Sequence, residues 1–279
     1  MLILPFFLRL YMGIMKEIKF FIILTGSLFL LFQTGTSQIN FGITPIRIEH
    51  AGNPGDNITD IFYIRNNSDS PIRIRAYSEN WTLSLEGPPN FSGNEPAPYS
   101  KKEWIKVNPQ DFRLNGNEVK MVRYTISIPQ GIDSAGYHAA VSFENVPLTP
   151  DDPASSRMVF TGKIAAAVYI KVGEVQPNGE ILDLTYHAEE KKGEIWLRIK
   201  NNSRTHFRLK GSIKLTHTID KKSITIDIPN EVVLPEGERK IKCLIPEKLE
   251  HGIYNAFCTL DIGRKELLGL DKELIIDHE

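Results

Sequence analysis

The sequence predicts an all-β protein made of two tandem immunoglobulin-like β-sandwiches. Two observations carry this prediction. Short segments that alternate apolar and polar residues recur along the chain, and one series of such segments occurs twice in the same order. Alternation with a period of two is typical of a strand with one face in a core and one face in water. Many short strands punctuated by Gly, Pro and Asn indicate a sandwich or a barrel.

Several segments before residue 173 have this strand pattern. They carry branched or aromatic residues at alternate positions, and they span residues 58–64, 72–77, 119–128, 137–143 and 158–172. No window combines a helical period with capping residues. We therefore expect strands throughout and no substantial helix.

The internal repeat is the most informative feature. Residues 61–68 (Ile-Phe-Tyr-Ile-Arg-Asn-Asn-Ser) are echoed by residues 196–203 (Trp-Leu-Arg-Ile-Lys-Asn-Asn-Ser), and residues 114–120 are echoed by residues 234–240. A repeat of this length indicates two homologous domains and excludes a short-period solenoid. The first copy is longer because of the stretch 86–98, rich in Pro, Gly and Asn, which predicts an inserted loop.

Two tyrosines stand at corresponding strand starts, Tyr137 in the first copy and Tyr254 in the second. In immunoglobulin-like sandwiches, a tyrosine near the start of strand F bonds through its hydroxyl to the backbone at the corner. We expect both tyrosines to form such corners. The alternative is a tyrosine that only packs at a strand start.

The N-terminal residues have the features of a secretory signal peptide. Lys16 and Lys19 precede an apolar run of about 13 residues, 20–32, and small polar residues follow up to Ser37. The run is shorter than the roughly 20 residues of a spanning helix. We expect cleavage after Ser37 and export from the cytoplasm, with an uncleaved anchor as the alternative.

The predicted organisation has three parts. Residues 1–37 form the signal peptide, 38–173 an N-terminal immunoglobulin-like domain with a long last strand, and 174–279 a C-terminal immunoglobulin-like domain. No apolar run of spanning length follows the signal peptide. The exported chain is therefore expected to have no membrane span.

Cys243 and Cys258 are the two cysteines of the chain. Each alternates in phase with apolar residues of its strand, so both are expected to point inward, from strands of opposite sheets. An oxidising compartment permits a disulfide between them. The residues leave two alternatives open, a bonded pair and two buried thiols.

Composition and motifs argue against nucleic-acid binding and catalysis. The formal net charge is −1, whereas a nucleic-acid binder shows a basic stripe. The seven histidines are scattered without the spacing of metal ligands, and no nucleophile elbow, phosphate-binding glycine loop or paired-carboxylate motif occurs. We predict no enzyme activity, no cofactor and no metal.

The segment 157–170 is the last strand of the predicted first domain and is unusually long. A strand that overruns its sheet exposes unpaired backbone, which is a liability unless something pairs with it. Peptide recognition by strand addition uses an edge of this kind. The alternative is an ordinary strand that faces the core.

At this point the sequence resembles the periplasmic chaperones of pilus assembly, the chaperone–usher type, as a divergent member. The resemblance rests on the opening strand 41–48, the segment 104–109 before 112–114, and the Tyr137 strand that leads to a long last strand. The resemblance implies a chaperone that captures subunits with an incomplete sandwich by lending its strand 157–170. It also implies that a subunit's chain end is held in the interdomain cleft, and that an outer-membrane usher is a further partner.

The resemblance also implies two basic anchors for that chain end. Arg47 falls at the first anchor position, and Ala165 stands where the family has a lysine. Lys163 lies two residues earlier and points to the same face, so it is the candidate substitute, with a backbone offset of several Å.

Met158 and Phe160 align with the apolar residues that the family donates to the subunit, and Ser156 stands at a third such position. Burial of large apolar side chains at roughly 1.5–3 kcal/mol each makes such capture plausible. The alternative function is a structural or adhesive immunoglobulin-like module of the periplasm or cell surface. An enzyme or its accessory domain is the remaining class.

Overall fold

The computed structural model describes residues 40–93, 97–148, 161–188 and 193–277 of the chain. Residues 40–279 form one compact unit. The fold is all-β, as predicted, and consists of two β-sandwiches that follow each other along the chain. The predicted signal peptide, 1–37, lies outside the described residues.

The first sandwich contains β1 to β10 and one short turn of 3-10 helix. Their bounds are β1 Phe41–Thr44, β2 Arg47–Gly52, β3 Asn57–Asn66, β4 Ile72–Thr82, β5 Asn90–Gly93, η1 Lys102–Trp104, β6 Ile105–Asn108, β7 Asp111–Leu114, β8 Val119–Ser127, β9 Ala135–Val146 and β10 Lys163–Val172.

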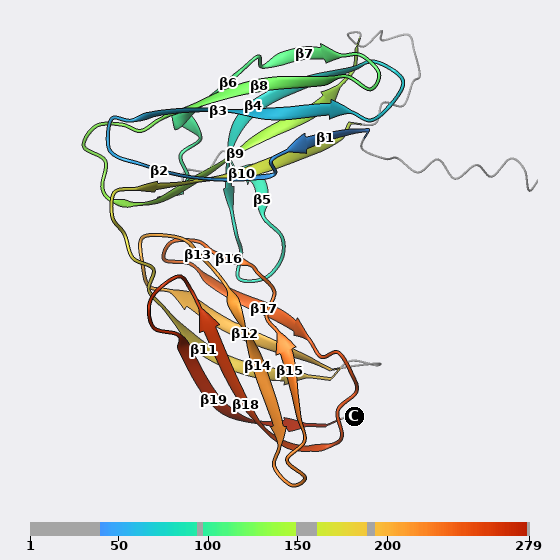
Figure 1. Ribbon diagram of the computed structural model, residues 1–279, viewed down its shortest axis with the longest axis vertical. Helices are drawn as coiled ribbons and strands as arrows, with labels where there is room; N and C mark the ends of the chain where they lie inside the picture. The colour runs from blue at the N-terminus through green and yellow to red at the C-terminus, as the bar shows by residue number, and fades with distance from the viewer. Residues whose placement is uncertain (1–39, 94–96, 149–160, 189–192, 278–279) are drawn as a thin grey trace, which may run out of the picture. The chain divides into compact units, whose positions relative to one another are not determined.

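Two sheets form the layers of this sandwich (Figure 1). One has the strand order β1-β3-β8-β6, and the other has the order β2-β10-β9-β4-β5, with β7 paired to β4. The alternation in the sequence determines which side chains enter the core. In β3, for example, Phe62 and Ile64 are buried while Tyr63 and Arg65 are exposed.

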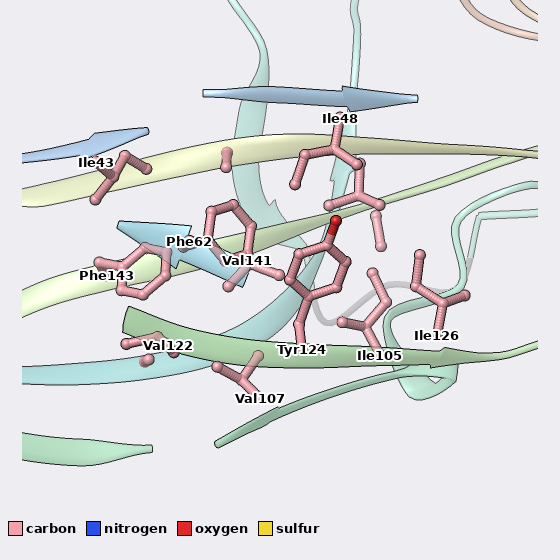
Figure 2. Packing of buried hydrophobic residues seen from close by; sticks show 14 of the residues in the cluster. Ile43, Ile48, Phe62, Ile105, Val107, Val122, Tyr124, Ile126, Val141 and Phe143 are labelled. Carbon is pink, nitrogen blue, oxygen red and sulfur yellow. The ribbon is translucent and has the colours of Figure 1, made fainter. Parts of the chain in front are cut away.

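The core of the first sandwich lies between these two sheets. Figure 2 shows Phe62, Tyr124 and Phe143 near its centre, with Ile43 and Val107 among the surrounding aliphatic residues. The ring of Phe62 lies 4.8 Å from that of Tyr124 and 5.2 Å from that of Phe143, centroid to centroid. Tilted and edge-to-face pairs at such distances are favourable beyond the area that they bury.

The second sandwich contains β11 to β19. Their bounds are β11 Gly179–His187, β12 Glu194–Asn201, β13 Phe207–Arg208, β14 Lys210–His217, β15 Ser223–Asp227, β16 Val232–Val233, β17 Glu238–Leu244, β18 Gly252–Asp261 and β19 Leu268–Ile276. The main sheets have the orders β11-β12-β17 and β15-β14-β18-β19, and β13 pairs with β16. A separate apolar cluster, from Leu184 to Ile276, forms its core.

The change from one sandwich to the other falls between Val172 and Gly179. Among the described strands, no sheet contains strands from both sides of this segment. The predicted boundary at residue 173 lies within it. The exact division into domains stays a prediction.

A buried asparagine at the end of β3 explains why the Asn-Asn-Ser segment occurs in both copies of the repeat. Asn66 is fully buried, and its Nδ2 donates to the carbonyl oxygens of Ser70 and Asn115, both at 2.8 Å. Its Oδ1 accepts from the backbone N–H of Ser68 at 3.0 Å. One amide side chain therefore satisfies three backbone groups that would otherwise be unpaired in the turn.

Asn201 at the end of β12 repeats this arrangement. Its Nδ2 donates to the carbonyl oxygens of Thr205 at 2.8 Å and Leu234 at 2.9 Å, and its Oδ1 accepts from the N–H of Ser203 at 2.9 Å. We call Asn66 and Asn201, with these partners, the amide clamps. They confirm that the echoed Asn-Asn-Ser segments have the same structure.

The predicted correspondence between residues 114–120 and 234–240 is wrong by one residue. In the amide clamps Asn115 has the same role as Leu234, whereas the prediction matches Leu114 with Leu234. The turn residue with positive φ is Asn117 in the first copy and Glu236 in the second. The prediction matched the Glu and Lys residues that the two segments share. The turn residue with left-handed backbone instead determines which residues of the two copies correspond.

Both tyrosine corners are confirmed. The Tyr137 hydroxyl donates to the carbonyl oxygen of Asp133 at 3.0 Å, and the Tyr254 hydroxyl donates to that of Glu250 at 3.1 Å. Each bond reaches back four residues and closes the corner before strand β9 or β18. The same bond in both copies supports the immunoglobulin-like assignment.

Cys243 and Cys258 are both buried and both free. They lie on β17 and β18, strands of different sheets, as expected. Burial raises the pKa of each thiol to about 12. A thiol with so high a pKa holds almost no thiolate near neutral pH and reacts slowly. Of the two alternatives, this structure has the buried thiols and not the disulfide.

Candidate partner-binding edge and cleft

Strand β10 has neighbours on both sides over only part of its length. It pairs with β9 from Lys163 to Val172, and it pairs with β2 only from Ala167 to Val172. Residues 163–166 therefore have a strand on one side only, within the described part of the chain. We call this stretch the open edge.

The direction of the backbone groups at the open edge follows from two hydrogen bonds. The N–H of Ala167 donates to the carbonyl of Ile46 on the β2 side, at 3.0 Å, whereas the carbonyl of Gly162 accepts from Asn145 on the β9 side. Successive residues of a strand point these groups to opposite sides. The N–H and C=O groups of Lys163 and Ala165 therefore point to the open edge.

The open edge exists because the first strand of the chain changes sheets. β1 pairs with β3 in one sheet, the chain passes through Pro45, and β2 then pairs with β10 in the other (Figure 1). A proline has no N–H to continue a ladder. β2 begins at Arg47, opposite Ala167, so the earlier residues of β10 receive no partner from it.

The predicted strand 157–170 needs correction. Thr161 and Gly162 are not in a strand, and residues 167–170 are paired on both sides. The sequence did not reveal that β2 lies beside the second half of β10. Ser156, Met158 and Phe160, the residues aligned with the donated apolar positions, lie outside the described residues.

Arg47 is exposed at the start of β2. Its Nε lies 3.6 Å from Oε1 of Glu49, and its register partner on β10 is Ala167. Lys163 is four residues from Ala167, so the backbones of the two predicted anchors are about 13 Å apart along the strand.

Lys163 is already engaged with another group. Its Nζ lies 3.1 and 3.2 Å from the two carboxylate oxygens of Glu79, and 5.9 Å from the centre of the Phe91 ring. Glu79 also accepts a hydrogen bond from the Ser142 hydroxyl. Ala165, at the family's lysine position, packs in an apolar cluster with Trp81. The structure does not bring Lys163 and Arg47 together.

A different arginine lies near Arg47. Nε of Arg208, on β13 of the second sandwich, donates to Oε1 of Glu49 at 3.4 Å, and its guanidinium lies 5.2 Å from the centre of the Tyr169 ring. Glu49 therefore lies between two arginines, one from each sandwich. Sequence reasoning missed Arg208, because no spacing or motif connects it with Arg47.

A groove of about 770 Å³ adjoins this cluster. Its apolar walls come from both sandwiches, and four cationic side chains and two carboxylates also line it. The apolar residues include Trp81, Phe91, Ala167, Tyr169, Trp196 and Val232, the cations are Arg208, Arg239, Lys240 and Lys242, and the acids are Glu86 and Glu231. Mostly apolar walls with a few charged groups are typical of a ligand groove.

The loop between β4 and β5 forms one side of this groove and is bound to the second sandwich. Arg239 Nη1 donates to the carbonyl oxygens of Ser84 at 2.7 Å and Gly87 at 3.2 Å. The N–H of Lys240 donates to the carbonyl of Leu85 at 2.8 Å. We call residues 83–89 the strap. It lies at the start of the insertion predicted from residues 86–98.

An aromatic cluster with one buried histidine, His138, and one half-buried histidine, His206, lies beside the strap. The ring of Trp81 is 5.0 Å from His138 and 5.8 Å from Tyr169, and Tyr169 is 4.4 Å from His206. Burial lowers the pKa of His138 and of His206 to about 4. Nδ1 of each ring is buried without a hydrogen-bond partner among the described residues. Both imidazoles are therefore neutral at pH 7.

The part of the chain that the structure describes contains no group of three or more His, Cys, Asp or Glu side chains able to hold a metal ion. No helix in that part is long and apolar enough to cross a membrane.

Comparison with known proteins gives matches among solved structures only. No family model matches the chain, and no curated protein does. The matching structures include fimbrial chaperones, the class that the sequence resembles. The class 5 fimbriae chaperone CfaA is 18% identical, with a TM-score of 0.45, and the match covers 85% of this chain and 100% of that chain.

Several of the matching structures are complexes. The Salmonella enterica SafA pilin in complex with the SafB chaperone gives 15% identity and a TM-score of 0.44, covering 85% of this chain and 98% of the other. The CsuC–CsuE chaperone–tip subunit complex of Acinetobacter baumannii also gives 15% and 0.44, covering 84% and 97%. At these identities and TM-scores the likeness by itself carries no conclusion about function.

Proposed function

We propose that this chain is a non-enzymatic periplasmic chaperone that captures pilus-type subunits with an incomplete sandwich by pairing them with the open edge of β10. The observation that carries the proposal is the one-sided pairing of residues 163–166. An unpaired edge of a sheet binds an extended segment through backbone hydrogen bonds. The class of partner, including an outer-membrane usher, comes from the sequence resemblance.

The side chains at the open edge support strand addition. Ala165 is small and partly buried in the apolar cluster with Trp81, so no long side chain extends from it beside the unpaired backbone. Ile164 is partly buried at the margin of the core. An added strand would cover Ile164 and satisfy the N–H and C=O groups of Lys163 and Ala165. Such an edge is otherwise prone to unwanted pairing.

The first test removes one hydrogen-bond donor from the open edge. Ala165→Pro deletes an N–H that points away from β9, and proline is tolerated at such an edge position. With a peptide copying the last strand of a pilus-type subunit, we expect an affinity at least about tenfold lower, because a backbone bond is lost and the ring obstructs the approach. Fluorescence polarisation measures the affinity.

Ala165→Ser is the matched control, because it retains the N–H, and it should bind within about twofold of the original chain. Urea unfolding should place both variants within about 1 kcal/mol of that chain. Equal binding by the proline variant, in a folded state, would contradict strand addition. The structural or adhesive module would then be the better reading, because the pairing of β10 with β2 favours a closed sheet.

We further propose that Arg47 and Arg208, and not Lys163, hold the subunit's terminal carboxylate. Both arginines contact Glu49, and arginine recognises carboxylates through two parallel hydrogen bonds. A bound carboxylate would compete with Glu49 for them. Lys163 is paired with Glu79, so it is less available for this role.

The second test compares peptides that end in a free carboxylate or in an amide. The original chain should prefer the carboxylate by about tenfold or more, because hydrogen bonds to charged groups contribute about 1.5–3 kcal/mol. Arg47→Ala and Arg208→Ala should each reduce this preference strongly, whereas Lys163→Ala should retain it. A preference lost only in the lysine variant would restore the anchor that the sequence predicts.

A further inference from the structure

The outward face of the sheet β1-β3-β8-β6 has an unusual composition. Tyr63, Val119 and Met121 are 46%, 50% and 63% exposed, and Ile61 is half-buried beside them. Tyr63 pairs directly with Met121 across β3 and β8. Side chains at such paired positions are in contact on one face of the sheet. These four residues therefore form one continuous apolar strip.

Three cations surround this strip. Arg65 pairs with Val119, Arg123 pairs with Ile61, and Lys106 lies opposite Thr125 on the neighbouring strand β6. All three side chains are exposed, and none has an ion pair or hydrogen bond within the described residues. The one acid of these four strands, Asp60, is exposed but has the phase of the buried Phe62 and Ile64, and it lies 3.9 Å from His50 on that side of the sheet. We call the strip and these cations the basic–apolar face.

The internal repeat provides a comparison within the same chain. In the second sandwich, Trp196, Arg198 and Lys200 occupy the positions of Ile61, Tyr63 and Arg65. There Arg198 is paired with Glu238, and Glu194 on the same strand is paired with Lys242. Charges of both signs thus neutralise one another on that face. The first copy has no acids at the corresponding positions and has exposed apolar side chains there, which the fold itself does not require.

From this contrast we propose that the basic–apolar face is a docking surface for a second protein whose own surface presents carboxylates around an apolar side chain. Exposed apolar patches bordered by polar residues mark interaction sites, and unpaired cations select a partner of opposite charge. The face lies on the sheet opposite the one that contains β10. A partner here and a strand at the open edge would therefore occupy different layers.

An acidic protein fits this face better than a membrane or a second copy of the chain. Two identical basic faces would repel each other, which excludes a symmetric dimer through this surface. The basic charges are few and flank a flat apolar strip, whereas segments that bind anionic lipids carry clusters of several Lys and Arg. The proposal does not depend on the function proposed above.

The experiment uses a blocked synthetic peptide in which Glu alternates with Leu and Phe, and a counterpart in which Lys replaces every Glu. Binding to the purified chain is measured by isothermal titration calorimetry at low and high salt. We expect the acidic peptide to bind, the basic peptide to bind at least tenfold more weakly, and the affinity to fall with salt, because charges at an exposed face are screened.

Variants locate the binding. Arg123→Glu and Met121→Ser should each lower the affinity for the acidic peptide at least fivefold. Lys214→Glu and Ile275→Ser make the same kinds of change on the outward face of the second sandwich and should leave it unchanged. The outward faces that carry these four substitutions do not contribute to the open edge. Binding of a subunit strand at the open edge should therefore persist in all four variants.

Several results would overturn the proposal. These are equal binding of both peptides, absence of binding by the acidic peptide, or equal loss in the control variants. Binding to vesicles containing phosphatidylglycerol, without binding to the peptide, would assign the face to a membrane. Self-association in sedimentation that Met121→Ser abolishes would assign it to a second copy of the chain.

Discussion

Replacing Arg239 by alanine should lower the free energy of unfolding by about 2–4 kcal/mol. The side chain is 6% exposed; it bonds to the carbonyls of Ser84 and Gly87 in the strap and is paired with Glu231. The substitution leaves three acceptors without their donor at the junction of the two sandwiches. Urea unfolding, followed by tryptophan fluorescence, measures the change.

Arg198→Ala is the matched control for this prediction. Arg198 belongs to the same sheet and is paired with Glu238, but its side chain is 52% exposed, and exposed pairs contribute at most about 1 kcal/mol. If the Arg198 variant loses as much free energy of unfolding as the Arg239 variant, the contacts of Arg239 with the strap do not contribute the predicted stability. Arg239→Lys should be intermediate, since lysine retains the charge but not the planar fork.

Mild acid should destabilise the protein through His138 and His206. Burial lowers both pKa values to about 4, and the unfolded chain has the ordinary histidine pKa of about 6.5. Between these values the unfolded state binds more protons, so stability rises with pH there. The contribution is complete above about pH 6.5 and is lost as pH falls through about 4. Each histidine contributes at most about 3 kcal/mol.

Burial outweighs the groups around the two rings, which act in both directions. Glu49 raises the pKa of His206, whereas Arg208 and Lys171 lower it. The Trp81 carbonyl raises the pKa of His138, whereas the His206 charge lowers it. Thermal unfolding at a series of pH values should show a decline in stability below pH 6.5, before carboxylates such as Asp183 titrate.

His206→Gln should make this decline shallower, because the unfolded state then takes up as much as one proton fewer relative to the folded state. His251→Gln, which changes a histidine whose side chain is 67% exposed, should leave it unchanged. A flat profile between pH 6.5 and 4.5 would contradict the neutral state of both rings in the folded protein.

The sequence predicts those parts of the fold that depend on local alternation. The predicted strand at 119–128 matches β8, and the segment 58–64 lies within β3, because the side chains of each strand alternate between core and water. The tyrosine corners are predicted because each bond spans four residues along the chain. Such short-range features need no knowledge of distant pairing.

The site is less predictable because its parts come from distant segments. Arg47 was found through the resemblance, but its neighbour Arg208 belongs to the other sandwich, and Arg239 contacts the strap more than 150 residues away in sequence. The length of the open edge depends on where β2 begins to pair with β10, and no local pattern records this register. Pairing across a fold is decided by packing, which a periodicity does not contain.

The amide clamps have a consequence for how this chain can change. Asn66 and Asn201 fix the same turn from inside, whereas the outward residues three positions earlier in the two strands, Tyr63 and Arg198, share no chemistry. The residue that fixes each turn is thus distinct from the residues that face solvent and other molecules. The surface residues of the two sandwiches can therefore diverge, and bind different partners, while the fold of each sandwich stays the same.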